Sequence, residues 1–381
     1  MPASVLERPC RILALEPYYG GSHRAFLEGW RERSSHEFTI FGLPAYKWKW
    51  RMRHAAVTLA AEATEAVSNG QQWDVLFCSD MLNLAEFRGL APESIASLPS
   101  ILYFHENQLT YPVQKEDPRD FHFAFSNFVA AVAANNCWFN SQFHLDEFCV
   151  ALDDLLQRMP DYQPRDAVTA IRQKSCVQPP GVDIRTRKAS AEAAGPLSIL
   201  WSARWEHDKN PKVFFDSLRS LKRQGVAFTV TVVGESFRSV PTEFEAARRE
   251  FSEHISAWGF LPRHEYVAAL HAADVIVSTA LHEFFGIAVV EAMMAGAYPL
   301  LPNRLSYPEL LARDANPENA EFFYSGTATH LSARLAELAG TSRRELARSA
   351  QRSQEVVARY AWSRRAPALD EAVSRLLESR K

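Results

Sequence analysis

Two carboxylates, Glu283 and Glu291, flank a short glycine-containing segment, Phe285–Ile287, in the last third of the sequence. An apolar run at 274–278 precedes the segment and helix-forming residues follow it, which predicts a strand, a loop carrying Glu283 and a helix containing Glu291. Free N–H groups at a helix start bind phosphate, and a glycine lets it approach closely. A carboxylate beside an anion site suits sugar hydroxyls, and Glu291 could reach a ribose. The pattern favours a nucleotide-sugar site, although acidic residues near helix starts also occur because they complement the helix dipole.

Arg204 and Lys209 are two cations whose chemistry would also suit a nucleotide-sugar site. They follow a predicted strand at 197–202 and precede a helical pattern. A guanidinium fork and an ammonium point charge could converge on a diphosphate and stabilise the charge that develops when a sugar–diphosphate bond breaks. The sequence has no Asp-x-Asp motif, and Asp153-Asp154 falls in a helical pattern typical of surface charge. We therefore expect no metal and no cofactor, although arginine and lysine alone are common surface residues.

Length and composition are those of an ordinary globular protein with two domains. The chain has 381 residues, of which 47% are hydrophobic and 23% charged, and its net charge is −3. This charge does not suggest a globally basic nucleic-acid-binding protein, but it permits a local basic patch. Five cysteines at no metal-like spacing predict buried thiols. Without an apolar run long enough for a bilayer or a signal-type N-terminus, we expect a cytoplasmic protein with no stable membrane association.

The first half places polar residues at the ends of predicted strands. Gly20 and Gly21 follow a strand at 11–15 and precede a helical pattern, which is a weak phosphate signal and equally typical of a tight turn. His105 directly follows a strand at 100–104. Because ligands bind at the carboxyl ends of parallel strands, His105 is a candidate site residue. The alternative is a structural histidine that caps the strand.

Cations alternate with two tryptophans near the start of the chain. The residues are Lys47, Trp48, Lys49, Trp50, Arg51 and Arg53. Three interpretations remain open. The segment could be a solvated helix start, an RNA-facing patch with bases stacked on tryptophan and phosphates on the cations, or an attachment to an anionic membrane surface.

Alternation of strands and helices along the chain predicts an α/β fold with two doubly wound parallel-sheet domains that face a cleft. We expect an N-terminal acceptor-side domain at 1–184, a nucleotide-sugar-binding domain at 185–361, with a polar linker at 185–196, and a last amphipathic helix at 362–381 that packs back on the N-terminal domain. The stretch 326–359 is predicted to be helical.

The chain resembles the retaining glycosyltransferases that have two Rossmann-like domains, an architecture called the GT-B fold. The matching residues are Arg204, Lys209, Gly259–Pro262 and the segment from Glu283 to Glu291. Family members often carry proline at 284 and glycine at 210, neither of which touches a group proposed for chemistry. More distinctive segments resemble the family of tRNA-queuosine α-mannosyltransferases, also called glycosyltransferase-like domain-containing proteins. These segments are Leu15–His23, Tyr103–Leu109 with Tyr111-Pro112, and Phe139–Ser141.

The resemblance implies transfer of mannose from GDP-mannose to queuosine in the anticodon loop of tRNA-Asp, with retention and a front-face mechanism. It also implies roles for the site residues. Arg204 and Lys209 would hold the diphosphate, together with the backbone N–H groups of Phe285, Gly286 and Ile287. Glu283 and His105 would contact the mannose, and Glu291 would hold the ribose. Phe260 and Leu261 would lie along the guanine, and Gly20 and Gly21 would line the cleft.

Two alternatives stay open at the level of the sequence. One is a transferase of the same fold that acts on a lipid-linked or glycan acceptor. The other is a non-catalytic RNA-binding protein on a decayed transferase fold, although decay would be expected to remove charged site residues first. Arg204, Lys209, Glu283 and Glu291 are all present.

Overall fold

The computed structural model describes residues 8–112, 121–184, 195–236 and 241–379. The predicted linker therefore lies almost entirely outside the described residues. The chain divides into two compact units. The first unit consists of Met1–Gly181 with Trp362–Lys381, and the second unit of Val182–Ala361.

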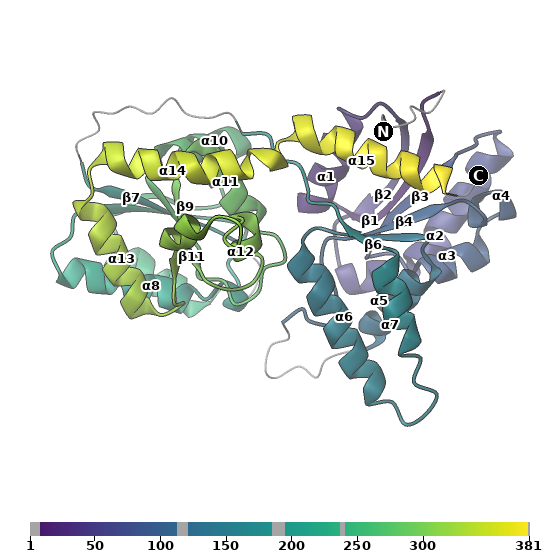
Figure 1. The fold of residues 1–381 in the computed structure, drawn as a ribbon, viewed down its shortest axis with the longest axis horizontal. Helices are drawn as coiled ribbons and strands as arrows, with labels where there is room; N and C mark the ends of the chain where they lie inside the picture. The colour runs from purple at the N-terminus through teal and green to yellow at the C-terminus, as the bar shows by residue number, and fades with distance from the viewer. Residues whose placement is uncertain (1–7, 113–120, 185–194, 237–240, 380–381) are drawn as a thin grey trace. The chain divides into compact units, whose positions relative to one another are not determined.

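The first unit is built on a parallel sheet whose strands have the order β2-β1-β3-β4-β5-β6 (Figure 1). The strands are β1 (Arg11–Tyr19), β2 (Glu37–Pro44), β3 (Val75–Ser79), β4 (Ser100–Phe104), β5 (Asn136–Phe139) and β6 (Ser175–Val177). The helices are α1 (Gly21–Arg31), α2 (Trp48–Ser68), α3 (Leu84–Leu90), α4 (Glu93–Ala96), α5 (Phe121–Ala133), α6 (Gln142–Gln157), α7 (Asp166–Gln173) and α15 (Trp362–Glu378).

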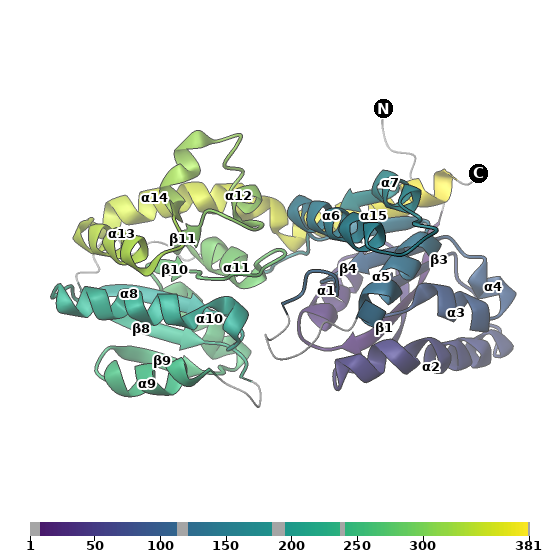
Figure 2. The ribbon, with the colours of Figure 1, turned by 90° about the horizontal axis from the view of Figure 1, so that it is seen from below.

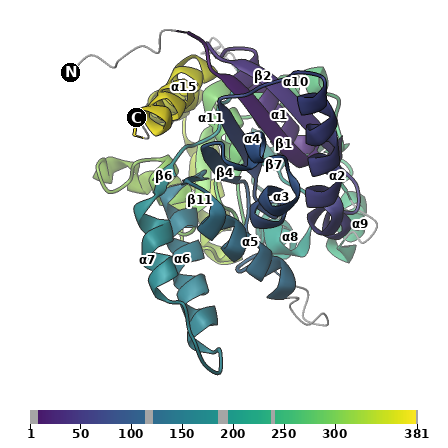
Figure 3. The same cartoon turned by 90° about the vertical axis from the view of Figure 1, so that its right-hand side faces the viewer.

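Both faces of this sheet are covered, which explains why its central strands are apolar throughout rather than alternating. In β1, Leu13 and Leu15 belong to a core with residues of α2, α3, α5 and α6, whereas Ile12 and Ala14 belong to a second core with residues of α1 and α15. Figure 3 shows α2 and α15 on opposite faces of the sheet, and Figure 2 shows α2 alongside α3. Because successive side chains of a strand point to opposite faces, alternate residues of β1 contribute to the two cores.

The second unit repeats the architecture with the parallel strand order β12-β11-β10-β7-β8-β9. The strands are β7 (Leu197–Ser202), β8 (Phe228–Val233), β9 (Ile255–Gly259), β10 (Val275–Val277), β11 (Tyr298–Pro302) and β12 (Phe323–Tyr324). The helices are α8 (Pro211–Arg223), α9 (Thr242–Glu250), α10 (Arg263–Ala272), α11 (Ile287–Ala295), α12 (Tyr307–Leu310), α13 (Ala328–Gly340) and α14 (Arg343–Val357), with short 3₁₀ turns η1 (His207–Lys209), η2 (Pro317–Phe322) and η3 (Ala358–Tyr360). Helices α11 and α14 pack together, as do α8 and α13 (Figure 1). The predicted α/β class with two doubly wound sheets is confirmed.

The stretch 326–359 is helical, as predicted, but it is divided into α13 and α14 because Ser342 starts a new helix. Its Oγ accepts the N–H of Glu345 at 3.3 Å and donates to the Glu345 carboxylate at 2.8 Å. The spacing Ser-x-x-Glu is a capping-box signal, so the break was visible in the sequence.

The expectation of buried thiols holds, since all five cysteines are free, four of them buried and Cys176 half-buried. Among the helices of the described residues, none combines the length and the apolar character that crossing a membrane requires.

Helix α15 follows the whole second unit in the chain and packs on the first. Its first residue, Trp362, fits against two glycines, since a Cβ on Gly29 or Gly181 would lie 2.4 or 2.1 Å from the Trp362 ring. Further along α15, the buried Asp370 accepts hydrogen bonds from Trp30 Nε1 (2.8 Å), Ser34 Oγ (2.6 Å), Ser35 N–H (2.7 Å) and Ser35 Oγ (2.8 Å). A single carboxylate thus joins the C-terminal helix to α1 and the turn that follows it.

Replacement of Asp370 by alanine should lower the free energy of unfolding by roughly 2–4 kcal/mol, because several donors lose a charged acceptor. Urea denaturation measures the loss, and hydrogen exchange should show α15 opening before the sheet. The neighbouring Glu371→Ala removes only an exposed pair with Arg375 and should change stability by less than about 0.5 kcal/mol. Equal effects of the two variants would contradict the anchoring role.

Candidate active site

The second unit brings the predicted nucleotide-sugar segments together at one edge of its sheet. β7 and β10 are neighbouring parallel strands, with Trp201 in register with Val277. Their carboxyl ends lie side by side, so the loops that follow, 203–210 and 278–286, are adjacent. Hydrogen bonds between the loops run from Leu281 N–H to Asp208 O (2.7 Å), from Thr279 Oγ1 to Lys209 O (2.7 Å) and from Lys209 Nζ to His282 O (2.7 Å).

The ammonium group of Lys209 is buried between these loops. Besides donating to His282 O, Nζ lies 3.0 Å from Asp208 Oδ2 and 3.4 Å from Glu283 Oε2. Burial lowers the pKa of this lysine, but the two carboxylates outweigh burial and raise the pKa above 10.5, so the group is charged. An ammonium has three N–H donors, and three acceptors surround it. Lys209 is therefore a fixed point charge.

Arg204, the other predicted cation, is more exposed. Its guanidinium lies 3.6 Å from the Glu206 carboxylate, and its side chain is 40% exposed. The charge of Arg204 opposes protonation of Lys209, which means that both cations act on the same region. Two cations in one region, one fixed and one near solvent, are suited to binding an anion.

Helix α11 begins directly behind the second loop. Gly286 precedes it in the left-handed backbone region (φ 93°), and a Cβ there would lie 3.1 Å from the Tyr307 ring. Phe285 is buried, and its carbonyl accepts a hydrogen bond from Ser306 Oγ at 3.0 Å. The N–H groups of Gly286 and Ile287 belong to the helix start, which lacks intrahelical acceptors. The backbone of this segment, rather than its side chains, is thus available to an anion.

Glu291 is more constrained than its sequence context indicates. Its Oε1 lies 2.7 Å from a guanidinium nitrogen of Arg263, and its Oε2 accepts a hydrogen bond from Tyr266 Oη at 2.9 Å. Arg263 and Tyr266 lie one turn apart on α10. Each carboxylate oxygen can still accept a further hydrogen bond. The two partners hold the carboxylate in one orientation.

Phe260 and Leu261 follow β9 but differ in exposure. The Phe260 side chain is strongly exposed, with 73% of the residue surface accessible, whereas Leu261 packs partly against the core. An exposed aromatic ring can stack on a nucleotide base. Of the two, Phe260 is therefore placed to offer a flat face.

Sequence reasoning missed residues that shape this site. A Cβ on Gly234 would lie 1.8 Å from the carbonyl oxygen of Ala203, so only glycine fits beside the first loop. Arg304 donates to Ala280 O (3.0 Å) and Thr279 O (3.2 Å) in the second loop. Gly234 directly follows the apolar strand β8, which is a usable signal, but nothing local marks Arg304.

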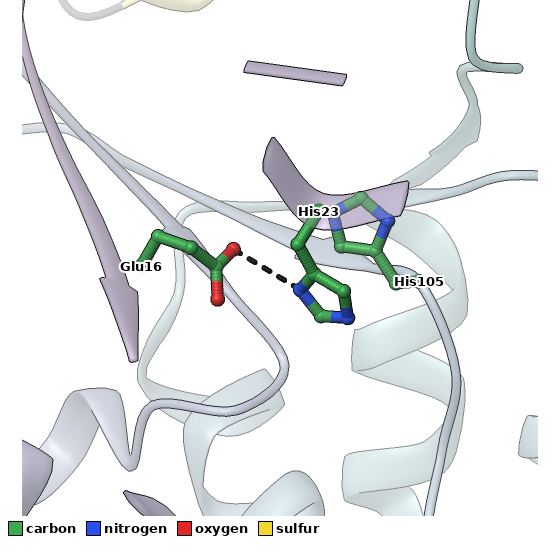
Figure 4. Close-up of side chains that lie close together, drawn as sticks. All are labelled: Glu16, His23 and His105. Atoms are coloured by element: carbon green, nitrogen blue, oxygen red, sulfur yellow. Dashed lines mark ion pairs between the residues drawn. The ribbon is translucent and has the colours of Figure 1, made fainter. Parts of the chain in front are cut away.

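The predicted site residues Gly20, Gly21 and His105 lie in the first unit. Gly20 caps α1, and a Cβ on it would meet Ala45 Cβ at 2.4 Å, whereas Gly21 has a left-handed backbone (φ 51°). The His105 N–H donates to Asp80 Oδ1 at 2.9 Å. Its ring stacks on His23, which pairs with the buried Glu16 (Figure 4).

The cation-rich segment forms the first turns of α2, which starts at Trp48. Its side chains differ in exposure. Lys47, Lys49, Trp50 and Arg53 are exposed, whereas Trp48 and Arg51 are half-buried. Trp48 packs against Phe123, and Arg51 donates to Pro44 O at 2.9 Å. We call Lys47, Lys49, Trp50 and Arg53 the α2 patch. Trp50 is the tryptophan available for stacking, which the sequence did not distinguish from Trp48.

Comparison with known families divides the chain into two matched regions. Residues 11–182 match the family described as tRNA-queuosine alpha-mannosyltransferase N-terminal, and residues 183–353 match Glycosyl transferases group 1. The tRNA-queuosine alpha-mannosyltransferase of Drosophila melanogaster is 38% identical over 314 residues, which cover 80% of this chain and 82% of that protein. The 2-deoxystreptamine glucosyltransferase of Streptomyces kanamyceticus is 31% identical over 141 residues, or 37% and 35% of the two chains.

Among solved structures, the fold is similar to that of Anabaena Alr3699/HepE in complex with UDP and glucose, with TM-score 0.66, 16% identity and coverage of 96% of this chain and 99% of that chain. Sucrose-phosphate synthase from Thermosynechococcus elongatus gives TM-score 0.72, 15% identity and coverage of 97% and 100%. Fold and sequence together define a glycosyltransferase of the GT-B class, as predicted. More narrowly, the chain belongs to the tRNA-queuosine alpha-mannosyltransferase family.

Replacement of Lys209 by alanine should destabilise the second unit by roughly 3 kcal/mol, because the largely buried Asp208 and its neighbour Glu283 lose their shared cation. Urea denaturation followed by tryptophan fluorescence measures the loss. Lys212→Ala, which removes an exposed pair with Asp216, should change stability by less than about 0.5 kcal/mol. If the two variants unfold at the same urea concentration, Lys209 does not hold the loops together.

Proposed function

We propose that this protein transfers mannose from GDP-mannose to queuosine in the anticodon loop of tRNA-Asp, with retention at the anomeric carbon. The observation that carries the proposal is the 38% identity, over 80% of the chain, to the tRNA-queuosine alpha-mannosyltransferase of Drosophila melanogaster. The match of residues 11–182 to the N-terminal family of that name supports it, because the group 1 match defines only the class of transferase. A tRNA acceptor agrees with the expected cytoplasmic location.

In this proposal the donor diphosphate lies at the start of α11, between Arg204 and Lys209. The N–H groups of Gly286 and Ile287 and the helix dipole add to the two cations. Positive charge fixed in advance stabilises the negative charge that develops on the leaving oxygen. These groups supply the stabilisation for which other transferases use a metal, so the proposal requires none.

Glu283 would change partners when the donor binds. Its 3.4 Å contact with Lys209 is longer than the contacts of Lys209 to His282 O and Asp208. A phosphate oxygen can replace this weakest contact, after which the Glu283 carboxylate accepts hydrogen bonds from the hexose hydroxyls. Glu283, which pairs with Lys209 before the donor binds, would then bind the sugar.

The chemical step exchanges one bond for another at the anomeric carbon. The bond from that carbon to the diphosphate oxygen breaks, and a bond to a hydroxyl oxygen of queuosine forms on the same face. The leaving phosphate takes the proton of the attacking hydroxyl. The products are mannosyl-queuosine and GDP. His105 would contact the mannose, and Gly20 and Gly21 would let the backbone approach the donor.

The nucleoside would use the remaining predicted residues of the second unit. Glu291, oriented by Arg263 and Tyr266, would accept hydrogen bonds from the ribose hydroxyls. Phe260 would stack on the guanine, with Leu261 beside it. On the acceptor side, the α2 patch would contact the tRNA through phosphates at Lys47, Lys49 and Arg53 and through a base at Trp50.

The purified protein should transfer labelled mannose from GDP-mannose to tRNA that contains queuosine and not to the same tRNA without it. Glu283→Gln should reduce transfer at least about 100-fold, because hydrogen bonds that strengthen in the transition state are lost. Glu337→Gln, an exposed carboxylate on α13, serves as the control with unchanged transfer.

Equal labelling of both tRNAs, or of neither, would refute the acceptor assignment. Transfer to a lipid-linked or glycan acceptor would favour the alternative within the same fold. Retention of full activity by Glu283→Gln would refute the proposed donor site. UDP-glucose as a better donor than GDP-mannose would refute the donor assignment.

Charge reversal in the α2 patch should weaken tRNA binding without affecting the donor. For Lys49→Glu with Arg53→Glu we expect the KM for tRNA to rise at least about tenfold and the salt dependence of binding to fall by about two released counterions. The KM for GDP-mannose and its slow hydrolysis should not change. Arg348→Glu, an exposed residue on α14, is the control. An unchanged KM for tRNA would mean that the α2 patch is a solvated helix start.

A further inference from the structure

A buried carboxylate stands at the carboxyl end of β1 in the first unit. Glu16 has no accessible surface. Its Oε1 accepts hydrogen bonds from the Tyr18 N–H and from Ser79 Oγ, both at 2.9 Å, and its Oε2 lies 3.2 Å from Nδ1 of His23. A buried carboxylate needs a compensating charge. His23 is the residue that lies in position to supply this charge.

His23, in the first turns of α1, faces acidic groups from three strand ends. These are Glu16 on β1, Asp80 after β3 and Glu106 after β4, while the ring of His105 covers one of its faces. Burial lowers the pKa of His23, but Glu16 and the other carboxylates outweigh burial and raise that pKa from 6.5 to about 9. Burial raises the pKa of Asp80 to about 8, although the charge of His23 by itself lowers that pKa. At neutral pH, His23 is an imidazolium.

His105 is held beside this imidazolium with little freedom. Its N–H donates to Asp80 Oδ1 and its carbonyl accepts from Asn140 Nδ2, both at 2.9 Å. The two histidine rings are stacked, with centroids 3.9 Å apart and planes inclined by 29°. Tyr103 packs at 4.6 Å from the His105 ring with its plane at 61°. Both the backbone and the ring of His105 are therefore fixed.

Burial and the charge of His23 act together on the charge of His105. Burial lowers the pKa of His105 well below 6.5, and the neighbouring His23 and His144 lower it further. Two cationic rings in contact would repel each other strongly. His105 is thus a neutral ring, and its buried Nε2 makes no hydrogen bond within the described part of the chain.

The same three side chains, Glu16, His23 and His105, bring possible metal-binding atoms within 4.8 Å of one another. Their orientation does not suit a metal. A histidine binds a metal in the plane of its ring at about 2.0 Å from the nitrogen. Two planes inclined by only 29°, with centroids 3.9 Å apart, have not converged at that distance. Moreover, both oxygens of Glu16 have protein partners, Oε1 through the Tyr18 N–H and Ser79 Oγ and Oε2 through the ion pair with His23 (Figure 4).

We propose that His23 is a positioning residue for His105. The His23 imidazolium, anchored by Glu16, supports the His105 ring face to face and keeps it neutral, so that His105 presents an unprotonated ring to the sugar. Only the last clause, on what His105 touches, rests on the proposed function. The charge relation between the two rings belongs to the first unit by itself.

The first test is a titration of the histidine rings by NMR, with the signal of His105 identified by its loss in His105→Gln. In the wild-type protein the midpoint of the His105 ring should lie well below the ordinary histidine value of 6.5. In His23→Phe, which keeps a stacked ring without charge, and in Glu16→Gln the midpoint should rise by at least about one pH unit. The double variant Glu16→Gln/His23→Phe leaves no unpaired buried charge and should show the same rise in a well-folded protein.

The second test is the pH dependence of kcat for mannose transfer. The pH at which the rate falls, as the ring that must be neutral takes up a proton, should be higher in the double variant than in the wild type by the same amount as the His105 midpoint rises, at least about one pH unit. His330→Gln, on α13 in the second unit, should behave as the wild type.

The outcomes separate the proposals. An unchanged His105 midpoint in the double variant, together with a lower kcat at every pH, would make His23 merely structural and overturn the inference. A bound metal, found in stoichiometric amount and lost in His23→Phe, would also overturn it. A raised midpoint without any transfer to queuosine-containing tRNA would support the charge relation and refute the proposed acceptor instead.

Discussion

The buried ammonium group of Lys209 is the interaction on which the candidate site in the second unit of this glycosyltransferase depends. It lies between the loops after β7 and β10 and is held by His282 O, Asp208 and Glu283. A charge this deeply buried is tolerated only with partners, and the partners come from both loops. The requirement to neutralise one cation therefore sets the distance between the two halves of the site.

The two units hold their charged groups by the same physical means. In the second unit a lysine is kept charged by Asp208 and Glu283, and in the first a histidine is kept charged by Glu16. In both, parallel strands align their carboxyl ends, so residues distant in the sequence become neighbours. The consequences differ. Lys209 joins two loops beside the start of α11, whereas the ring of His23 is stacked on that of His105.

The C-terminal helix shows how the chain closes the first unit. α15 completes the core on one face of the first sheet, where it packs against α1, although the whole second unit separates the two in the chain. The contact depends on glycines at 29 and 181, which leave room for Trp362, and on Asp370. The core of the first unit is thus incomplete without α15.

The sequence by itself determined the fold class, because alternation of apolar strands with amphipathic helices admits few architectures. It also indicated the transferase class, through the family resemblance carried by Arg204, Lys209, Gly259–Pro262 and the segment from Glu283 to Glu291. Elements with local signals were predictable for the same reason. The capping box at Ser342 was there to be found, although the prediction overlooked it.

Only the tertiary structure decided which groups share charge and which surfaces remain exposed. The pairing of Glu16 with His23, the supports of Glu291 at Arg263 and Tyr266, and the bonds from Arg304 to the second loop join residues whose separation along the chain carries no signal. Similarly, Trp48 and Trp50 are equivalent in the sequence, yet helix periodicity turns one toward Phe123 and the other toward solvent. Spacing along a chain specifies local backbone geometry, whereas burial and charge pairing depend on what packs opposite each residue.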